Sequence, residues 1–304
     1  MKYLSGKKPH IMMISALLIV GSIGVFRRFI PLSSSMLAFL RGIIGAASLF
    51  LFAIITKKKI FIKLPAKKMI LMILTGVVLG VNWILLFEAY NYTTISKATL
   101  AYYMQPTILL FVSPLIFKEK LTLKKVICAA LALAGMVLVS GVLELNGAAS
   151  NDLRGVLLGL GAAVFYTLVV ILNKINEGVD AYEKSVFQLL SAAIVLIPYL
   201  IIRNEFAGIA LDSRGIILVL IVGIIHTGLV YILFFGSMSG LKAQTISVLS
   251  YIDPITAMIV SALLLKEGLS VLALLGAVLI ICSSLVAEND HLTPSPSGQK
   301  GWRK

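Results

Sequence analysis

Acidic residues, histidines and cysteines are all scarce in this chain. Among 304 residues there are 13 Asp and Glu, three His and two Cys, against 27 Lys and Arg. Cys128 and Cys282 lie inside apolar runs, so they predict neither a disulfide framework nor a zinc site. The sequence holds no glycine-rich phosphate loop and no His-Glu-x-x-His motif. We therefore expect no cofactor, no metal and no enzymatic activity.

Charged residues of either sign are also few, and this identifies the class of protein. They make up 13% of the chain, hydrophobic residues make up 59%, and the mean hydropathy is +1.02. Soluble domains average about 25% charged and 45–50% apolar residues. A chain of this size cannot hide so much apolar surface from water, so we expect an all-α integral membrane protein whose partner is the lipid bilayer. The net charge of +14 does not predict nucleic-acid binding, because the basic residues lie in short loops between apolar runs.

Ten apolar runs are long enough to cross a bilayer, which takes roughly 20 residues. The first is interpreted as a span and not as a signal peptide, because it contains no small-x-small cleavage site. The runs cover residues 10–29, 33–55, 68–90, 95–117, 123–142, 153–173, 182–202, 214–237, 243–265 and 269–287.

The distribution of basic residues predicts the orientation of these ten helices. If the N-terminus is inside, 19 Lys and Arg fall in inside segments and seven in outside segments. Positive residues concentrate on the cytoplasmic side of membrane proteins. We expect a multi-pass protein of the plasma membrane with both termini in the cytoplasm. The polar tail, residues 288–304, is predicted to be disordered there.

The second half of the chain repeats part of the first. With a shift of 148 residues, positions 84–131 fall on 232–279 and share 13 identities in 48 positions, without a gap. The matches include Tyr103 with Tyr251, Pro106 with Pro254, and the pair Lys118-Glu119 with Lys266-Glu267. A repeat of five spans crosses the membrane an odd number of times, so the second copy must be inverted, as in many transporters. We therefore predict two inverted five-helix repeats, residues 1–145 and 150–287.

These motifs resemble the EamA-type repeat of the drug/metabolite transporter superfamily. The resemblance implies ten spans, cytoplasmic termini, a central cavity lined by spans one to four and six to nine, and peripheral fifth and tenth spans. It also implies export of amino acids or other metabolites, or import of small nutrients, driven by protons or by exchange. It rests on Asn82-Trp83-Ile84-Leu85-Leu86-Phe87-Glu88-Ala89-Tyr90, Ala98-Thr99-Leu100, Tyr103-Met104-Gln105-Pro106, Lys118-Glu119, Arg41, and Asp253-Pro254 before Lys266-Glu267.

Two prolines and two ionisable residues are expected near the middle of the bilayer. Pro106 and Pro254 lie about eleven residues into their spans, and we expect each to kink its helix beside a cavity. Asp253 is a candidate proton carrier, or a partner for a cationic substrate group, because a titratable group at this depth is costly. His226 is a candidate proton relay. The alternatives are plain packing kinks, a permanently protonated aspartic acid and a structural histidine.

Arg41 and Glu88 are interpreted as a structural ion pair near the outer edge. The alternatives are that Arg41 binds a substrate carboxylate or extends outward to the membrane surface. The predicted substrate wall is aromatic with one amide, since Trp and Tyr faces can hold an amphipathic or cationic solute. Each of these aromatic residues alone could also simply face lipid. The wall residues are Trp83, Tyr103, Gln105, Tyr166 and Tyr251.

The sequence therefore predicts a secondary transporter that exports a small metabolite such as an amino acid by alternating access, coupled to protons or to exchange. A membrane-embedded enzyme acting on lipid-like substrates and a passive channel are the alternatives. The expected partners are the small-molecule substrate, the bilayer and protons as coupling ion, with no nucleic acid. A homodimer is one candidate for the oligomeric state.

Overall fold

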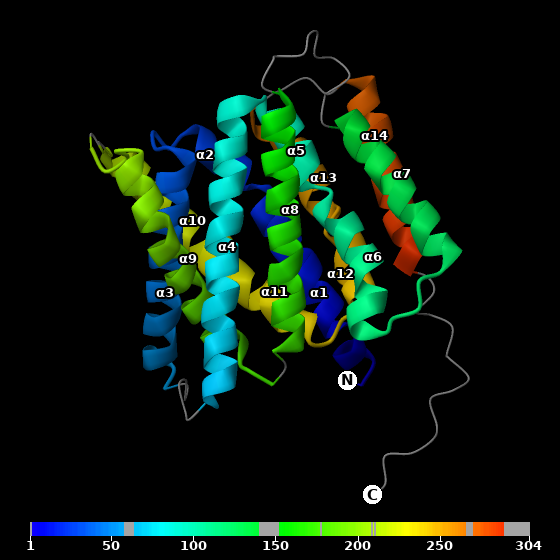
Figure 1. Ribbon diagram of the computed structural model, residues 1–304, viewed down its shortest axis with the longest axis horizontal. Coiled ribbons are helices and arrows are strands. Elements are labelled where there is room, and N and C mark those ends of the chain that lie inside the picture. The colour runs from blue at the N-terminus through cyan, green and yellow to red at the C-terminus, as the bar shows by residue number, and fades with distance from the viewer. Residues whose placement is uncertain are drawn as a thin grey trace, which may run out of the picture.

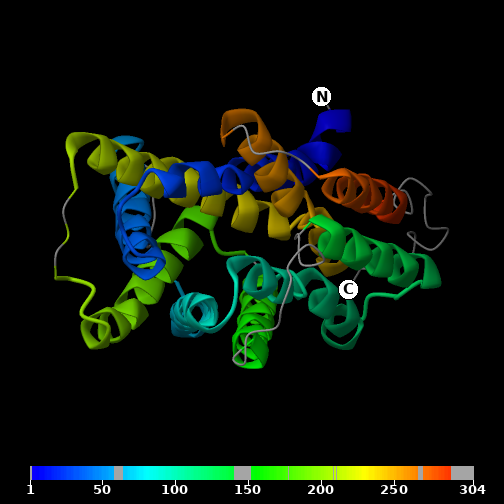
Figure 2. The same cartoon turned by 90° about the horizontal axis from the view of Figure 1, so that it is seen from above.

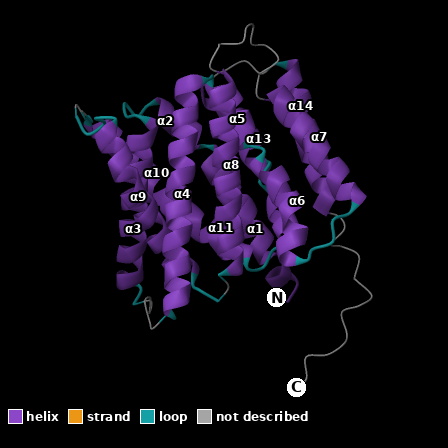
Figure 3. Cartoon of the chain, viewed as in Figure 1, coloured by secondary structure: helices purple, strands orange, loops and turns teal. Residues whose placement is uncertain are grey.

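The computed structural model describes residues 2–57, 64–139, 152–176, 178–207, 209, 211–265 and 270–288. Throughout this part of the chain the secondary structure is helical, and no strand occurs in it (Figure 3). The prediction of an all-α protein is confirmed. The predicted tail from residue 289 onward and the pair Lys266-Glu267 lie outside the described residues.

The helices follow one another with short connections. They are α1 (Lys2–Gly21), α2 (Ile23–Arg28), α3 (Ser34–Ile55), α4 (Ala66–Tyr92), α5 (Ile95–Tyr102), α6 (Gln105–Phe117), α7 (Leu123–Val139), α8 (Asp152–Ile175), α9 (Ala181–Ile202), α10 (Ser213–Gly223), the π-helical turn η2 (Ile224–Leu229), α11 (Val230–Met238), α12 (Ala243–Leu249), α13 (Ile252–Leu265) and α14 (Val271–Glu288).

Eight segments of the described chain are long and apolar enough to cross a membrane. Helix α7 and the described part of α14 are outside this set, so ten crossings stay a prediction. The eight segments are Lys7–Arg28, Ser34–Ile55, Ala66–Tyr92, Lys97–Phe117, Leu153–Ile175, Ala181–Ile202, Ser213–Met238 and Ala243–Leu264.

Large apolar side chains cover the outside of the bundle. Leu115 is 83% exposed, Ile202 82% and Leu263 73%, and they lie on three different helices. A soluble monomer rarely exposes more than a few hundred Å² of contiguous apolar surface. Only a hydrocarbon environment makes such a surface stable, so the chain is a multi-pass membrane protein.

The long helices stand side by side between two ends, called here the upper and lower ends as in Figure 1. Helix α4 runs from the lower to the upper end and packs against both α8 and α9 (Figure 1). Helices α7 and α14 pack on each other at one edge of the bundle, away from α3 and α10 (Figures 1 and 2). These are the helices of the predicted fifth and tenth spans, which the resemblance puts at the periphery.

Two of the predicted spans are interrupted at corresponding positions. Helix α5 ends at Tyr102 and α6 begins at Gln105, while α12 ends at Leu249 and α13 begins at Ile252. The outer bounds of each pair, Ile95–Phe117 and Ala243–Leu265, differ by the 148 residues of the sequence repeat. In Figure 1 the first pair runs from the upper to the lower end and the second pair runs back. The local structure thus reproduces the repeat that the identities predicted.

The two prolines start a new helix after each break, where kinks had been expected. Pro106 occupies the first turn of α6, and Pro254 is the third residue of α13. The first N–H groups of a helix have no acceptor within that helix, so a proline there removes no hydrogen bond. Consequently the predicted kinks are full interruptions of the helix.

Small residues let α4 approach α9 closely. A Cβ atom added to Gly76 would lie 2.6 Å from the carbonyl oxygen of Gln188 and from Cβ of Ser191. One turn further on, a Cβ on Gly80 would lie 2.8 Å from Cβ of Val195. Backbones that approach this closely gain dispersion contacts that larger residues would prevent, and such contacts drive helix association in lipid.

We expect Gly76→Val to destabilise the α4–α9 contact, because the new side chain would meet the backbone of α9. Overpacking of this kind costs about 1–3 kcal/mol. Thermal unfolding of the purified protein in detergent should show a midpoint several degrees lower. Gly24→Ala is the matched control, because nothing lies within 4 Å of a Cβ at that position. Equal midpoints for the two variants would contradict the packing argument.

Candidate functional site

A cavity of about 130 Å³ lies in the middle of the bundle, where both helix breaks meet it. It is smaller than the roughly 300–1,000 Å³ that pockets for drug-sized ligands occupy, so it suits a small solute. Eight of the residues singled out from the sequence line it. They are Arg41, Trp83, Tyr103, Gln105, Pro106, Tyr166, His226 and Asp253.

The rest of the wall is aromatic or apolar apart from Ser250, and these residues were not among the candidates selected from the sequence. His226, Val230 and Phe234 follow one another at intervals of four, so they share one face of η2 and α11. Counting in steps of four from His226 would therefore have predicted Val230 and Phe234 as wall residues. The additional wall residues are Leu17, Val20, Tyr102, Val230, Tyr231, Phe234, Phe235 and Ser250.

Asp253 connects the two helix breaks across the cavity. It lies in the first turn of α13, and its Oδ2 accepts a hydrogen bond of 3.2 Å from the hydroxyl of Tyr103, which lies in the break between α5 and α6. Helix α1 passes close by, since a Cβ on Gly21 would lie 2.8 Å from the backbone oxygen of Asp253. The protonation state of one carboxyl group therefore bears on a contact between the two interrupted spans.

His226 lies in the π-helical turn η2, a distortion often found at functional sites. Its Nε2 is 2.9 Å from the hydroxyl oxygen of Ser22, and its ring is 4.6 Å from that of Phe26. The Ser22 hydroxyl also donates to the backbone oxygen of Ile19 at 2.7 Å. The other nitrogen, Nδ1, is buried without a hydrogen-bond partner. Asp253 and His226 thus share a cavity and bond to different partners.

Arg41 also faces the cavity, and its environment corrects one expectation. Its guanidinium lies 4.9 Å from the ring centre of Trp83, and its Nε is buried without a hydrogen-bond partner. Glu88, its expected partner, instead pairs with Arg203 at 3.2 Å. The Arg41–Glu88 pair was predicted because the two residues lie at similar depths in their helices. Glu88, however, lies near the end of α4, where Arg203, the residue that follows α9, reaches it.

Two other selected residues lie off the cavity wall. Tyr251 is 1% exposed, and its hydroxyl is 2.8 Å from that of Thr107, so it joins α12–α13 to α6. Pro254 is buried beside Asp253 without lining the cavity. Among the residues whose side chains are described, no group of three His, Cys, Asp or Glu could hold a metal ion.

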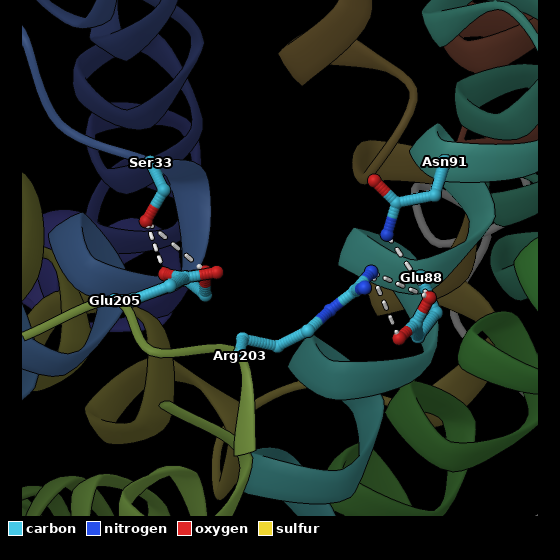
Figure 4. Close-up of polar contacts among 6 residues, drawn as sticks. Ser33, Glu88, Asn91, Arg203 and Glu205 are labelled. Carbon is cyan, nitrogen blue, oxygen red and sulfur yellow. Dashed lines mark hydrogen bonds and ion pairs between the residues drawn. The ribbon is translucent and has the colours of Figure 1, made fainter. Parts of the chain in front are cut away.

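Polar contacts tie the segment after α9 to the first half of the chain at the upper end. Figure 4 shows Arg203 reaching the Glu88 carboxylate, which also accepts a 3.0 Å hydrogen bond from Asn91. Glu205 accepts hydrogen bonds from the hydroxyls of Ser33 and Ser35, at the start of α3 (Figure 4). The hydroxyl of Tyr199, which accepts a hydrogen bond from the Arg203 guanidinium, and the charge of Glu88 raise the pKa of Arg203. This end is therefore joined by exposed, charge-assisted contacts.

A single carboxylate makes the corresponding link at the lower end. Lys118 ends α6 in the left-handed conformation, with φ of 54°. Glu119 then accepts hydrogen bonds from the backbone N–H groups of Ala243 (2.9 Å) and Gln244 (3.1 Å) at the start of α12. A carboxylate at a helix N-terminus satisfies unpaired donors and complements the helix dipole. Glu119, which the sequence repeat identified as part of the Lys118-Glu119 pair, thus caps α12 in the other half of the chain.

Comparison with known proteins agrees with this architecture. The sequence model of the EamA-like transporter family matches residues 7–141 and 153–287. The chain belongs to the EamA-like transporter family. The EamA-like chain is 31% identical over 255 residues to the uncharacterized transporter YxxF of Bacillus subtilis (strain 168), covering 82% of this chain and 79% of that protein. It is 28% identical to the uncharacterized transporter YwfM of the same organism, covering 92% of each.

One solved crystal structure has the same fold. Its chain superposes with a TM-score of 0.82, at 20% sequence identity, over 94% of this chain and 99% of that one. Together with the family match, this establishes that the resemblance seen in the sequence is correct and that the protein is a membrane transporter of the EamA type.

We expect Glu119→Ala to destabilise this EamA-like protein more than Glu88→Ala does. Glu119 caps a helix with two backbone hydrogen bonds, and losing such a cap costs about 1–2 kcal/mol. The Glu88–Arg203 pair is 26% and 41% exposed, and an exposed ion pair contributes about 0–1 kcal/mol. Unfolding midpoints in detergent give the comparison. A larger loss for Glu88→Ala would show that the upper ion pair is the stronger link.

Proposed function

We propose that this protein is a secondary active transporter that exports a small metabolite, such as an amino acid, by alternating access. One observation carries the proposal. A small cavity lies at two corresponding helix breaks, and it is lined by a cation, a carboxylate, an imidazole and aromatic rings. Irregular backbone inside a membrane is tolerated where it faces protein or a cavity, and transporters bind their substrates at such breaks.

The architecture that we propose for the full chain is ten transmembrane helices in two inverted repeats, residues 1–145 and 150–287. The shared 148-residue offset of the breaks and the two family matches support it. The excess of basic residues in alternate loops supports cytoplasmic termini in the plasma membrane, with residues 288–304 as a cytoplasmic tail. The upper end then faces outward. A homodimer stays an untested prediction.

In this mechanism Asp253 and His226 each take up and release coupling protons. The aromatic residues and Gln105 form the substrate wall. A deprotonated Asp253 holds the Tyr103 hydroxyl, which ties the two breaks together. When Asp253 takes up a proton, that hydrogen bond loses its charged acceptor and weakens by about half. Proton entry would thereby loosen the contact between the interrupted spans, which is the coupling that proton-driven export requires.

We expect Asp253→Asn to abolish accumulation against a gradient, while exchange of substrate persists at saturating substrate concentration. The amide keeps the shape of the side chain but cannot bind and release a proton. The measurement uses liposomes with an imposed pH gradient and a panel of labelled amino acids and amines. Asp212→Asn is the matched control, because Asp212 caps α10 through the N–H of Gly215 at 2.7 Å and Asn caps a helix as well as Asp does.

Undiminished uphill transport by Asp253→Asn would remove the coupling role. Dissipative flux of every solute, with no dependence on the gradient, would favour a passive channel. If the unsubstituted protein accumulates no solute under any gradient, the transporter proposal as stated fails.

A further inference from the structure

Two opposite charges face the central cavity without neutralising each other. Arg41 contacts the ring of Trp83, and Asp253 bonds to the hydroxyl of Tyr103. Among the described residues of the wall, Asp253 is the single carboxylate. Tyr166 lines the same cavity. The cavity therefore has a cationic pole and an acidic pole, with aromatic side chains on its wall.

An unpaired guanidinium at this depth needs a compensating partner. Arg41 is the eighth residue of α3, roughly 10 Å from the helix start. Charged side chains inside membrane helices are costly, and they normally pair with one another or line a substrate path. The one carboxylate that had been expected to pair with Arg41 is held by Arg203. The partner that remains is a group supplied from the cavity itself.

A second donor without a partner faces the same space. Gln105 is 3% exposed, lines the cavity at the start of α6, and its amide nitrogen Nε2 has no hydrogen-bond partner. Nε of Arg41 is in the same state. Unsatisfied buried donors are rare in native structures, and two that face one cavity call for a common explanation. Both donors suit a carboxylate, which offers two oxygens and several acceptor sites.

We infer that Arg41 binds the carboxylate of the transported solute and that the substrate class is a small zwitterion. The guanidinium and the Gln105 amide hold the carboxylate, while Asp253 and the neighbouring aromatic rings hold the ammonium group. Trp83 contacts the guanidinium through its ring, a contact that uses none of the guanidinium N–H donors. This inference rests on the proposed transport function for its biological meaning, yet it can be tested by binding alone.

The chain offers a reporter for this test. It has two tryptophans, Trp83 and Trp302. In a Trp302→Phe background the intrinsic fluorescence comes from Trp83, which touches Arg41 inside the cavity. A carboxylate that binds the guanidinium changes the field at the indole ring, so emission should shift with saturation.

The experiment titrates the purified protein in detergent with L-serine, L-leucine and L-phenylalanine, and with the carboxamide of each. We expect at least one amino acid to change Trp83 emission, and its carboxamide to bind about 10- to 100-fold more weakly, the loss typical of a charged hydrogen-bonded contact. Arg41→Gln should remove the difference between acid and amide, and Arg41→Lys should keep part of it. Arg203→Gln, which removes a guanidinium outside the cavity, should change neither. Unfolding midpoints identify any variant that fails to fold. If Arg41→Gln fails to fold, Arg41→Lys, which keeps the charge, is compared with the unsubstituted protein instead.

Three results would overturn the inference: equal binding of acid and amide, a preference for the acid that survives in folded Arg41→Gln, or no response to any panel member at millimolar concentration. A response to chloride as strong as that to the amino acids would also overturn it. Parallel assays in liposomes separate this inference from the transport proposal. Arg41-dependent binding without transport counts against the transporter alone, whereas transport unaffected by Arg41→Gln counts against the carboxylate site alone.

Discussion

A bilayer offers no hydrogen-bond partner to a backbone N–H or C=O group, so a chain can leave the helix at mid-depth only against protein or a cavity. The breaks at residues 103–104 and 250–251 obey this constraint, because both open onto the same enclosed space. Hydroxyl groups of neighbouring helices contact the backbone just after the first break. The hydroxyl of Ser247 on α12 donates to the backbone oxygen of Pro106, and that of Thr167 on α8, which donates to the backbone oxygen of Ala163 at 2.9 Å, lies 3.4 Å from the backbone oxygen of Gln105. The cavity exists because two spans are discontinuous, and its polar lining follows from the residues beside those breaks.

Side-chain chemistry around the breaks differs between the two halves. The 148-residue offset pairs Gln105 with Asp253 and Tyr102 with Ser250. One half therefore contributes a neutral amide, and the other contributes a group that can carry a charge. The bond from Tyr103 to Asp253 joins them across the cavity. A symmetric backbone thus supports an asymmetric site, in which one break carries an amide and the other a carboxyl group.

The location of the breaks could be predicted from the sequence, because Tyr103, Pro106 and their counterparts recur at a single offset. The repeat also predicted that Asp253 and Gln105 would lie at one depth, and both line the cavity. Depth along a helix, however, does not specify the direction of a side chain around it. This explains why Arg41 was expected to pair with Glu88, although Glu88 pairs with Arg203. It also explains why Tyr251 was assigned to the wall, although its hydroxyl bonds to Thr107.

The partner of a charged residue in a helical membrane protein depends on how helices from distant parts of the chain meet, and no local pattern records that. Ser22 and His226 are 204 residues apart and still share a hydrogen bond, because α1 packs against η2 and α11. The same is true of Glu119. The repeat identified this residue, but its hydrogen bonds to α12 depend on contact between the two halves.

The contacts at the two ends of the bundle differ in kind. At the lower end, Glu119 satisfies backbone donors that have no other acceptor. At the upper end, the Arg203–Glu88 and Glu205–Ser33 contacts join exposed side chains, whose partners water can replace. The upper contacts therefore cost less free energy to open than the lower one. In the export cycle that we propose, this difference would favour opening the outward end, which holds the Arg203–Glu88 pair, and the proton taken up by Asp253 would have to supply the energy that opens the other end to the solute.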